Sequence, residues 1–554
     1  MKIRTRNILY ILLPVVSLTL VNTSCKKDNN PTEQMRMFMP PGEIKATSAE
    51  TSVTLTWSAA LYQQSTDKSI TYTVQVSKDS LFNTVERTYL TDTTGVIITQ
   101  DSIPVRKKYY ARIKTNGNEI SPESKWLTSS SFKITGEQIF NALRDAEVKE
   151  TSLTLRWIVT QGLTKLVFTP ASGTPMEVAI SAADISSGVK VVNGLKGGTA
   201  YEVEIFQGTK SKGYLAFTTT AATAYTVVIT PADNLVTVID TCSNNAVIGL
   251  QPGVYSAGSN NFVVKQKTIT IKSVSGNTFD TKVNWKEFTL KGAGAGIKLQ
   301  DIEFDGLASG GQYFLNLTGL NSDAEAATFT NIEVTNCVIH NMANCLLRGN
   351  RGTGAAGDHK IGNIKFRGCL VYDNLLVSAY TLFTLDKLQF ALLDLSNSTF
   401  YNYGRDFIAA PTAVTTGPIP QINIDGCTIN YGGTSAKYVL LDANTNPVNF
   451  TTQNSIIANT PKAGGTVATT LFRGTGTGTT MSFSYNNTFG LFTGAATPTP
   501  VTLPTSYAYL TATTNRTIDL GWTGATTDFK LPAGSELRTG GKTGGVIGDP
   551  RWAY

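Results

Sequence analysis

The segments Ile332-Glu-Val-Thr-Asn-Cys337, Ile364-Lys-Phe-Arg-Gly-Cys369 and Ile422-Asn-Ile-Asp-Gly-Cys427 are copies of one short pattern. In each copy apolar and polar residues alternate, Asn or Gly stands next to last, and a small residue comes last. Alternation with a period of two indicates a strand with one buried face. The remaining copies in the series are Ile302–Leu307, Leu393–Ser398, Phe450–Ser455 and a weaker one that ends at Asn487.

Successive copies end 28 to 32 residues apart, and no helical pattern separates them. A strand that recurs once per unit predicts a solenoid whose coils stack their strands in register. Leucine-rich repeats are shorter and carry a leucine scaffold that this sequence lacks, and propeller blades are longer, at about 40 to 45 residues. We therefore predict a parallel β-helix over residues 223–554.

The last position of each copy forms a column of small residues, and the Asn or Gly beside it supplies the backbone angle of a turn. Cys337, Cys369 and Cys427 are interpreted as members of a ladder in the core, because unpaired Cys packs as a small hydrophobe. The sequence has no CxxC pair, and His340 and His359 lack neighbours spaced as zinc ligands. We expect neither a metal site nor a cofactor here.

Two stretches of short alternating strands precede the solenoid, and each opens with a strand that ends in Trp, at Trp57 and at Trp157. Such strands, separated by turn residues, fit β-sandwich modules over residues 41–135 and 136–222. We expect both Trp side chains to lie in module cores rather than to serve as sugar platforms.

The spacing of Trp57, Tyr72, Tyr109 and Tyr110 closely resembles a fibronectin type III module, and the second stretch resembles a shorter module of the same kind. The predicted fold class is therefore all-β, with two fibronectin type III-like β-sandwich modules followed by a parallel β-helix solenoid. The modules are interpreted as spacers that hold the solenoid away from a membrane.

Lys2, Arg4 and Arg6 precede an apolar run that leads to Asn22-Thr-Ser-Cys25. A basic start, a short apolar core and small residues before a cut predict a signal peptide over residues 1–24. A Cys directly after these small residues resembles the lipobox of bacterial lipoproteins, although Asn22 stands where Leu is usual. The resemblance implies a lipid anchor at Cys25, a tether over residues 25–40 and an outer-membrane lipoprotein exposed at the cell surface. Ordinary secretion, with cleavage beside Cys25, is the alternative.

The formal net charge of +7 falls to +4 without the three cations of the signal peptide. Nucleic-acid binding usually requires a concentrated basic face, so this weak balance predicts no nucleic-acid partner. It is compatible with an anionic polysaccharide.

Val227–Leu250 and Leu250-Gln-Pro-Gly-Val-Tyr255 resemble the opening coils of the pectate-lyase superfamily. Gly544–Trp552 resembles the end of a family of uncharacterised β-helix lipoproteins, which occur beside importers and enzymes for pectin-like polysaccharides. The resemblance implies a polysaccharide ligand, with the importer and the glycan-degrading enzymes as neighbours. It does not set the chemistry, because the superfamily holds lyases, hydrolases, esterases and binders.

Catalysis by such a fold would require clustered acidic or basic groups on successive coils. A lyase needs a carboxylate cluster that holds Ca²⁺ together with an Arg or Lys base, and a hydrolase needs paired aspartates. The repeats show neither set, so we assign no catalytic residue. Asp301, Glu303 and Asp305 come closest, and on one strand all three would face outward. We interpret them as solvated charges, with Ca²⁺ conceivable only for a lyase.

The second strand of each coil ends in polar residues with tyrosines nearby. Arginine can bond both oxygens of a carboxylate, and a tyrosine ring can stack on a sugar. We therefore expect a glycan-binding groove formed by Arg348, Arg351, Tyr380, Tyr403, Arg405, Tyr438 and Arg473.

Three hypotheses for the function follow. The first is a non-catalytic surface lipoprotein whose β-helix binds an extended, anionic, pectin-like polysaccharide for capture and use. The second is a lyase that acts on a uronate-containing glycan, with Arg348 or Arg405 as base. The third is a structural or adhesive surface protein. The missing acid and base clusters favour the first hypothesis over the second.

Overall fold

The computed structural model describes residues 36–61, 70–119, 121–349, 354–374 and 380–553. Strands hold 42% of the protein and helices 5%, which confirms the all-β prediction. The protein divides into two compact units: one runs to Ile139 and includes Ile205–Gly213, and the other holds Phe140–Glu204 and the residues from Tyr214 onward. The predicted signal peptide and Cys25 lie outside the described residues. No described helix combines the length and the apolar character needed to cross a membrane.

The first module is a fibronectin type III-like sandwich of two antiparallel sheets. Alternate side chains of both sheets meet in one core, where the rings of Trp57 and Tyr72 lie 5.5 Å apart, edge to face. One sheet contains β1 (Lys45–Ser48), β2 (Ser52–Thr56) and β5 (Gly95–Thr99). The other contains β4 (Arg87–Thr91), β3 (Tyr72–Ser77), β6 (Tyr110–Thr115) and β7 (Leu127–Thr128).

The second module also pairs a larger with a smaller sheet, and Trp157 is buried in it, as expected from the sequence. The larger sheet contains β10 (Met176–Ala179), β9 (Lys165–Pro170), β12 (Ala200–Gln207) and β13 (Lys210–Thr218). The smaller sheet contains β11 (Val189–Asn193) and β8 (Ser152–Arg156), and two short helices flank it, η1 (Asp145–Glu147) and α1 (Ala182–Ser187).

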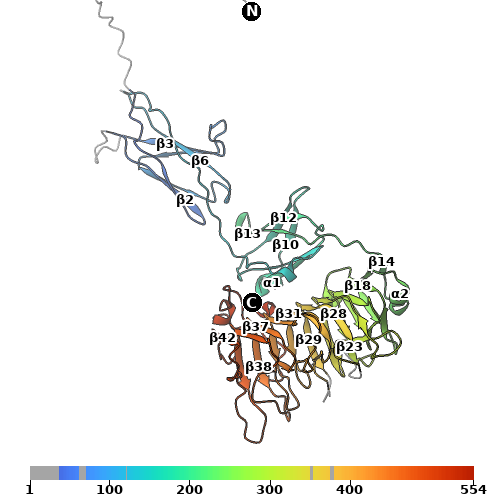
Figure 1. Ribbon diagram of the computed structural model, residues 1–554. Helices are drawn as coiled ribbons and strands as arrows, with labels where there is room; N and C mark the ends of the chain where they lie inside the picture. The colour runs from blue at the N-terminus through green and yellow to red at the C-terminus, as the bar shows by residue number, and fades with distance from the viewer. Residues whose placement is uncertain (1–35, 62–69, 120, 350–353, 375–379, 554) are drawn as a thin grey trace, which may run out of the picture. The chain divides into compact units, whose positions relative to one another are not determined.

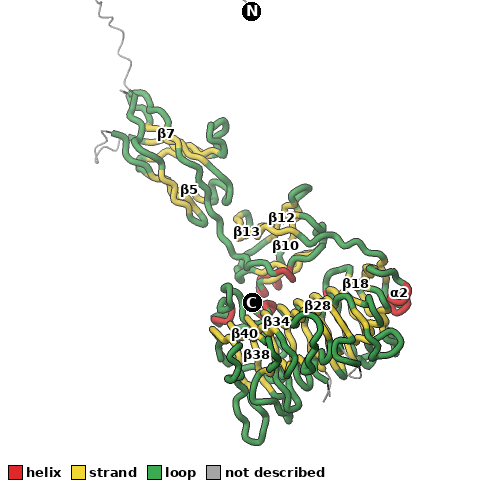
Figure 2. The backbone as a smooth tube through the Cα atoms, in the orientation of Figure 1, coloured by secondary structure: helices red, strands yellow, loops and turns green. Residues whose placement is uncertain are grey.

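The remainder of the second unit is a parallel β-helix of about nine turns, seen as the stacked strands in Figures 1 and 2. Three parallel sheets run along it, so the predicted solenoid is confirmed. The first sheet contains β14 (Val227–Ile229), β15 (Ala246–Leu250), β18 (Thr268–Ser273), β21 (Gly296–Gln300), β24 (Ala327–Thr328), β25 (Ile332–Thr335), β28 (His359–Arg367), β31 (Gln389–Ser396), β34 (Gln421–Asp425), β37 (Asn449–Gln453), β40 (Thr480–Ser484) and β42 (Leu510–Thr513).

The second sheet contains β16 (Gly253–Ser256), β19 (Thr281–Asn284), β22 (Glu303–Asp305), β26 (Val338–Met342), β29 (Leu370–Asn374), β32 (Thr399–Tyr401), β35 (Thr428–Asn430), β38 (Ile456–Thr460) and β41 (Asn487–Leu491). The third sheet contains β17 (Phe262–Lys265), β20 (Phe288–Lys291), β23 (Tyr313–Thr318), β27 (Cys345–Arg348), β30 (Phe383–Thr384), β33 (Ile408–Ala409), β36 (Leu441–Asn444) and β39 (Phe472–Gly474). The helix α2 (Leu235–Thr241) lies at the first coil and buries Leu235 and Ile239. Three 3-10 helices complete the unit: η2 (Thr278–Asp280), η3 (Glu536–Arg538) and η4 (Pro550–Trp552).

From β21 onward, each coil turns from the first sheet into the second through one residue with a positive φ. This left-handed conformation suits Gly and is tolerated by Asn and Asp. The φ angles range from 50° at Asn397 to 63° at Gly368. The corner residues from β21 onward are Asp301, Asn336, Gly368, Asn397, Gly426, Asn454, Tyr485 and Thr514.

The residue after each corner points inward and forms a ladder, as predicted for the cysteines. The backbone N–H of Cys369 donates to Ser398 Oγ, that of Cys427 donates to Ser455 Oγ, and both distances are 3.0 Å. The N–H of Ser455 donates in turn to Asn486 Oδ1, also at 3.0 Å. Burial raises the pKa of the Cys369 thiol to about 11, so this sulfur is a packing group and not a nucleophile.

The sequence-based register of the first copy is wrong by five residues. β21 pairs with β25, with Ile297 opposite Ile332, so the corner of this coil is Asp301 and not Gly306. The sequence pattern conceals this register, because Ile297-Lys-Leu-Gln-Asp-Ile302 has Asp in place of Asn or Gly next to last, and Ile in place of a small residue at the end. Asp301 therefore does not share a face with Glu303 and Asp305. Its buried carboxylate accepts a hydrogen bond from Lys149 Nζ at 2.7 Å.

The C-terminal segment, residues 515–553, packs on the outer face of the last coils of the second sheet. Trp522, Phe529 and Leu537 form a small core there with side chains of the sheet. Asp549 is buried, and its carboxylate accepts a hydrogen bond from Thr399 Oγ1 at 2.7 Å. The backbone N–H of Asp549 donates to Thr428 Oγ1 at 3.0 Å. This face of the solenoid is therefore covered by the protein itself.

Replacing Asn486 with Ala should destabilise the β-helix. Asn486 is wholly buried, accepts from the N–H of Ser455 and donates to the carbonyl of Thr452 at 2.9 Å. Its loss leaves the buried N–H of Ser455 unpaired and removes a hydrogen bond to the Thr452 carbonyl, which should lower the free energy of unfolding by about 2–3 kcal/mol. Urea unfolding followed by circular dichroism would measure this. Ser482→Ala, at an outward position of β40, is the control and should change stability by less than about 0.5 kcal/mol. Equal effects of the two variants would contradict the ladder.

Candidate functional site

The outer face of the third sheet carries one row of residues in register across six coils. Asn316, Arg348, Thr384, Ala409, Asp442 and Arg473 are successive partners in β23, β27, β30, β33, β36 and β39. The residues that alternate with them, such as Leu347 and Phe472, are buried in the solenoid core. Neighbouring parallel strands lie about 4.8 Å apart, so the row from Arg348 to Arg473 spans about 19 Å.

Arg348 lies between two tyrosine rings. Its guanidinium carbon is 4.8 Å from the centroid of the Tyr313 ring and 5.4 Å from that of Tyr380, and the two rings meet edge to face. Burial raises the pKa of Tyr313 to about 12, so the ring stays neutral. Within the described ranges, no carboxylate pairs with Arg348. Its charge is held by aromatic faces and is available to a ligand.

Arg473 is placed differently, because it has a carboxylate of its own. Its Nε and Nη2 atoms donate to Asp442 Oδ1 and Oδ2, each at 2.9 Å, and its guanidinium lies 5.0 Å from the Tyr438 ring centroid. Asp442 is 4% exposed, so this bidentate pair is largely desolvated. Arg473 therefore serves first to neutralise Asp442.

Arg405 lies in the loop before β33, with its Nε atom 3.5 Å from Asp406 Oδ1. Asp406 is buried and accepts a hydrogen bond from Thr381 Oγ1 at 2.6 Å. Burial raises the pKa of Asp406 to about 6, although Thr381 and Arg405 oppose the shift and Asp442 adds to it. A carboxyl group near this row thus titrates closer to neutral pH than an ordinary Asp.

Two tyrosines differ from the predicted groove: Tyr403 is buried, and Tyr313, which is not among the predicted residues, lies beside Arg348. Tyr403 is 3% exposed and packs against Phe407 in the core, so its ring cannot serve as a sugar platform. Tyr403 lies in the turn after β32, where strand alternation gives no guide to direction. Tyr313 was missed, although it is the register partner of Cys345 in the neighbouring coil. Arg351 lies outside the described residues. The structure brings Arg348 together with Tyr380, and Arg473 together with Tyr438.

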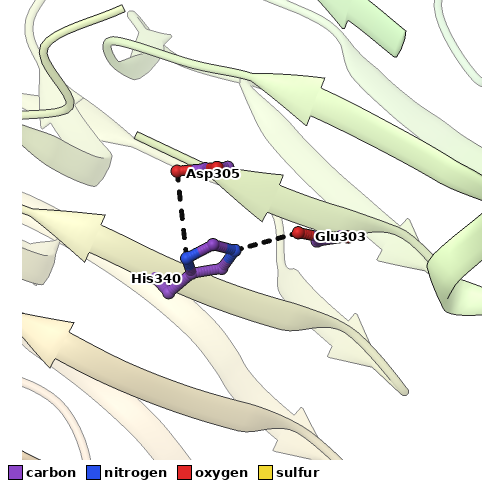
Figure 3. A group of neighbouring side chains, drawn as sticks. All are labelled: Glu303, Asp305 and His340. Atoms are coloured by element: carbon purple, nitrogen blue, oxygen red, sulfur yellow. Dashed lines mark hydrogen bonds and ion pairs between the residues drawn. The ribbon is translucent and has the colours of Figure 1, made fainter. Parts of the chain in front are cut away.

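A second cluster lies on the second sheet, where Glu303 and Asp305 of β22 stand beside His340 of β26. Figure 3 shows the imidazole between the two carboxylates, with one ring nitrogen toward each. His340 Nε2 is 3.1 Å from Glu303 Oε1, and His340 Nδ1 is 3.8 Å from Asp305 Oδ1. The repeat pattern does not predict this contact, because the register that it suggests for the first copy differs by five residues from that of the structure.

The charges of this cluster are compensated internally. Lys282 Nζ lies 2.9 Å from Glu303 Oε1 and 3.1 Å from Asp305 Oδ2, and the hydrogen bond to Glu303 is the main cause of its raised pKa. Burial would raise the pKa of Asp305, but hydrogen bonds from Asn341, the N–H of Leu307 and Lys282 together lower it. A metal ion would have to displace the ammonium group of Lys282. We therefore interpret the cluster as an ion-pair network.

The His340 ring also begins an aromatic stack along the second sheet. Its centroid lies 4.8 Å from that of Tyr372, which lies 5.0 Å from that of Tyr401. The Tyr401 ring then meets Phe529 of the C-terminal segment, edge to face. The ring faces are occupied by one another, so this stack stabilises the sheet and does not form an open platform for sugars.

No family model matches this sequence, and no curated protein matches it either. Among solved structures, a segment of two fibronectin type III domains from chicken tenascin is 16% identical, with a TM-score of 0.17, and the match covers 32% of this protein and 97% of the segment. The FN1–FN3 domains of chicken CNTN1 are 14% identical, with a TM-score of 0.16, over 34% of this protein and 70% of that chain. These scores are too low to support any argument about function.

Replacing Arg473 with Ala should destabilise the β-helix, because it leaves the buried Asp442 carboxylate without its partner. Removing one member of a largely buried pair should cost about 2–4 kcal/mol in the free energy of unfolding. Lys298→Ala is the control: Lys298 pairs with Glu333 at 3.1 Å, the side chains are 47% and 32% exposed, and the loss of this solvated pair should cost less than about 1 kcal/mol. Adding Asp442→Asn to Arg473→Ala should restore much of the stability. Failure of this rescue would show that the pair is not the cause.

The raised pKa of Asp406 predicts a pH dependence of stability. Its folded-state pKa of about 6 lies above its ordinary value of 3.8, so between these values the folded protein binds the proton more tightly than the unfolded protein. Asp406 therefore destabilises the fold at pH 7, by up to about 3 kcal/mol, and the penalty disappears as the pH falls toward 4. Asp406→Asn should be more stable than wild type at pH 7 and similar at pH 4 in parallel urea titrations. A difference that does not vary with pH would contradict the shift.

Proposed function

We propose that the protein is a surface lipoprotein that captures an extended anionic polysaccharide along the outer face of the third sheet. The observation that carries the proposal is Arg348, a half-buried guanidinium held between Tyr313 and Tyr380. Such a group can bond both oxygens of a uronate carboxylate, while the tyrosine edges contact the sugar. In this proposal Cys25 provides the lipid anchor in the outer membrane, and the sandwich modules are spacers.

The row geometry supports a chain-like ligand. Arg348 and Arg473 recur along the solenoid axis at one position of the coil, so a linear polymer laid along that axis can meet both. Arg473 contributes less to anion binding because Asp442 already neutralises it. The second sheet offers less room for such a polymer, since the C-terminal segment covers its last coils. An importer and glycan-degrading enzymes would be the natural partners of a protein with this role.

Arg348→Gln should weaken the binding of polygalacturonate and alginate about 10- to 100-fold, the loss expected for charge-assisted hydrogen bonds. Arg367→Gln, which removes the same charge from the outer face of the first sheet, is the control and should retain wild-type affinity. Isothermal titration calorimetry at low and high salt would measure both, and wild-type affinity should fall as salt rises.

Equal losses in the two variants would contradict a site at Arg348. The ultraviolet absorbance of unsaturated uronate, recorded in the same samples, separates binding from β-elimination. A rise in absorbance would replace the proposed function with a lyase. The absence of both binding and absorbance in the wild type would favour an adhesive or structural surface protein.

A further inference from the structure

A hollow of about 240 Å³ lies on the third sheet, beside the Arg348 row. Its lining includes Glu287, Thr289 and Lys291 of the β20 region and Thr318 of β23. Thr289 pairs with Asn316, which pairs with Arg348, so the hollow and Arg348 share one outer face. Thr318 lies on the strand next to that of Arg348, two residues beyond Asn316, which is the register partner of Arg348. The two positions are therefore about 4.8 Å apart across the strands and about 6.6 Å apart along them.

The polar groups in and beside this hollow are buried and fixed. Glu287 is 9% exposed, and its Oε1 atom accepts hydrogen bonds from Thr289 Oγ1 at 2.6 Å and from Asn316 Nδ2 at 2.7 Å. An ionised carboxylate only accepts, so this contact fixes which end of the Asn316 amide is the nitrogen.

Two further polar atoms are left unsatisfied. Asn316 Oδ1 and Thr318 Oγ1 are buried and have no hydrogen-bond partner among the residues that the structure describes. Buried polar atoms are nearly always paired, so unpaired ones at a hollow indicate a place where a ligand supplies the partner. The lining itself offers the carboxylates of Glu287 and Asp323, threonine hydroxyls including that of Thr318, and the ammonium group of Lys291. These groups match the hydroxyls of a sugar, each of which donates one hydrogen bond and accepts others.

The charges decide which kind of sugar fits. Glu287 and Asp323 bring two carboxylates to the lining, against one ammonium from Lys291. A uronate placed here would set a third carboxylate beside the buried Glu287, which is unfavourable at low dielectric. We propose that the hollow holds an uncharged sugar unit of the polymer whose uronate contacts Arg348. The ligand is then a mixed polysaccharide, in which neutral sugars are interspersed with uronates. This inference rests on the proposed function and adds the substrate class to it.

The test compares two probes of equal length: a rhamnogalacturonan backbone, which alternates a uronate with a neutral sugar, and a homogalacturonan, in which every unit is a uronate. Wild type should bind the mixed polymer about tenfold more tightly, the equivalent of one good hydrogen bond gained and one repulsion avoided. Thr318→Val keeps the shape and removes the unpaired hydroxyl. It should lose about tenfold in affinity for the mixed polymer and little for the homopolymer, with an unchanged or higher Tm.

Glu287→Gln removes the negative charge and should tighten the binding of homogalacturonan. The difference in affinity between the mixed polymer and homogalacturonan should therefore become smaller than in the wild type. Thr511→Val, at an exposed outward position of the first sheet, is the control and should change neither affinity. Two results would overturn the neutral subsite and leave polyuronate capture intact. One is that the wild type binds the two probes with equal affinity. The other is that Thr318→Val and Glu287→Gln both keep the wild-type preference for the mixed polymer. A wild type that binds neither probe would overturn the proposed function itself. Parallel loss of Tm and of all binding in Thr318→Val would reduce Thr318 to a structural role and overturn the subsite.

Discussion

The rest of the structure depends on the corner at which each coil passes from the first sheet to the second. One residue there takes a left-handed conformation, which costs a residue other than Gly about 1–2 kcal/mol. The side chain of the next residue points inward and forms a hydrogen bond with the neighbouring coil. Ser398 Oγ, for example, accepts a hydrogen bond from the backbone N–H of Cys369. Each such hydrogen bond contributes about 1 kcal/mol, so the ladder offsets the strain at the corner. Because the coils from β21 onward turn at the same point, their strands stay in parallel register.

This constraint applies to the inner scaffold of the solenoid and not to its outer faces. Inward and corner positions must repeat, because each one packs on its counterparts in the neighbouring coils. Outward positions are released from that requirement, so one row of the third sheet can hold residues as different as Arg348, Ala409 and Asp442. The repeat that reveals the fold therefore carries no information about the ligand. Function has to be inferred from the outward rows, where each side chain is read with its neighbours along the solenoid axis.

The sequence predicts what the corner dictates and little of what the loops decide. Asn336, Gly368 and Cys369 show the corner and the ladder directly, but Tyr485 and Thr514 occupy the same left-handed position without any signal in their residue type. Asp301 also stands at a corner where most copies have Asn or Gly, so the repeat pattern suggests a register for this coil that differs by five residues from the real one. In that register the contact of Glu303 with His340 cannot be predicted. Tyr380, Tyr403 and Tyr438 lie in loops of unequal length between the second and third sheets, and these loops carry no period. Strand alternation therefore could not show that Tyr403 turns inward while Tyr380 meets Arg348.

The arginines of the third sheet differ in what they can offer an anion. Arg473 is neutralised by Asp442 through two hydrogen bonds, so a ligand carboxylate would compete with an internal one that is already desolvated. Arg348 is held by ring faces, which orient the guanidinium without cancelling its charge. In the proposed role of polysaccharide capture, a site with one strong anchor of this kind would bind a single sugar weakly. A long polymer compensates, because once one unit is held, neighbouring units meet the row at a high effective concentration. The flat, periodic face of a solenoid is suited to this mode of binding, in which affinity comes from the length of the ligand rather than from the depth of a pocket.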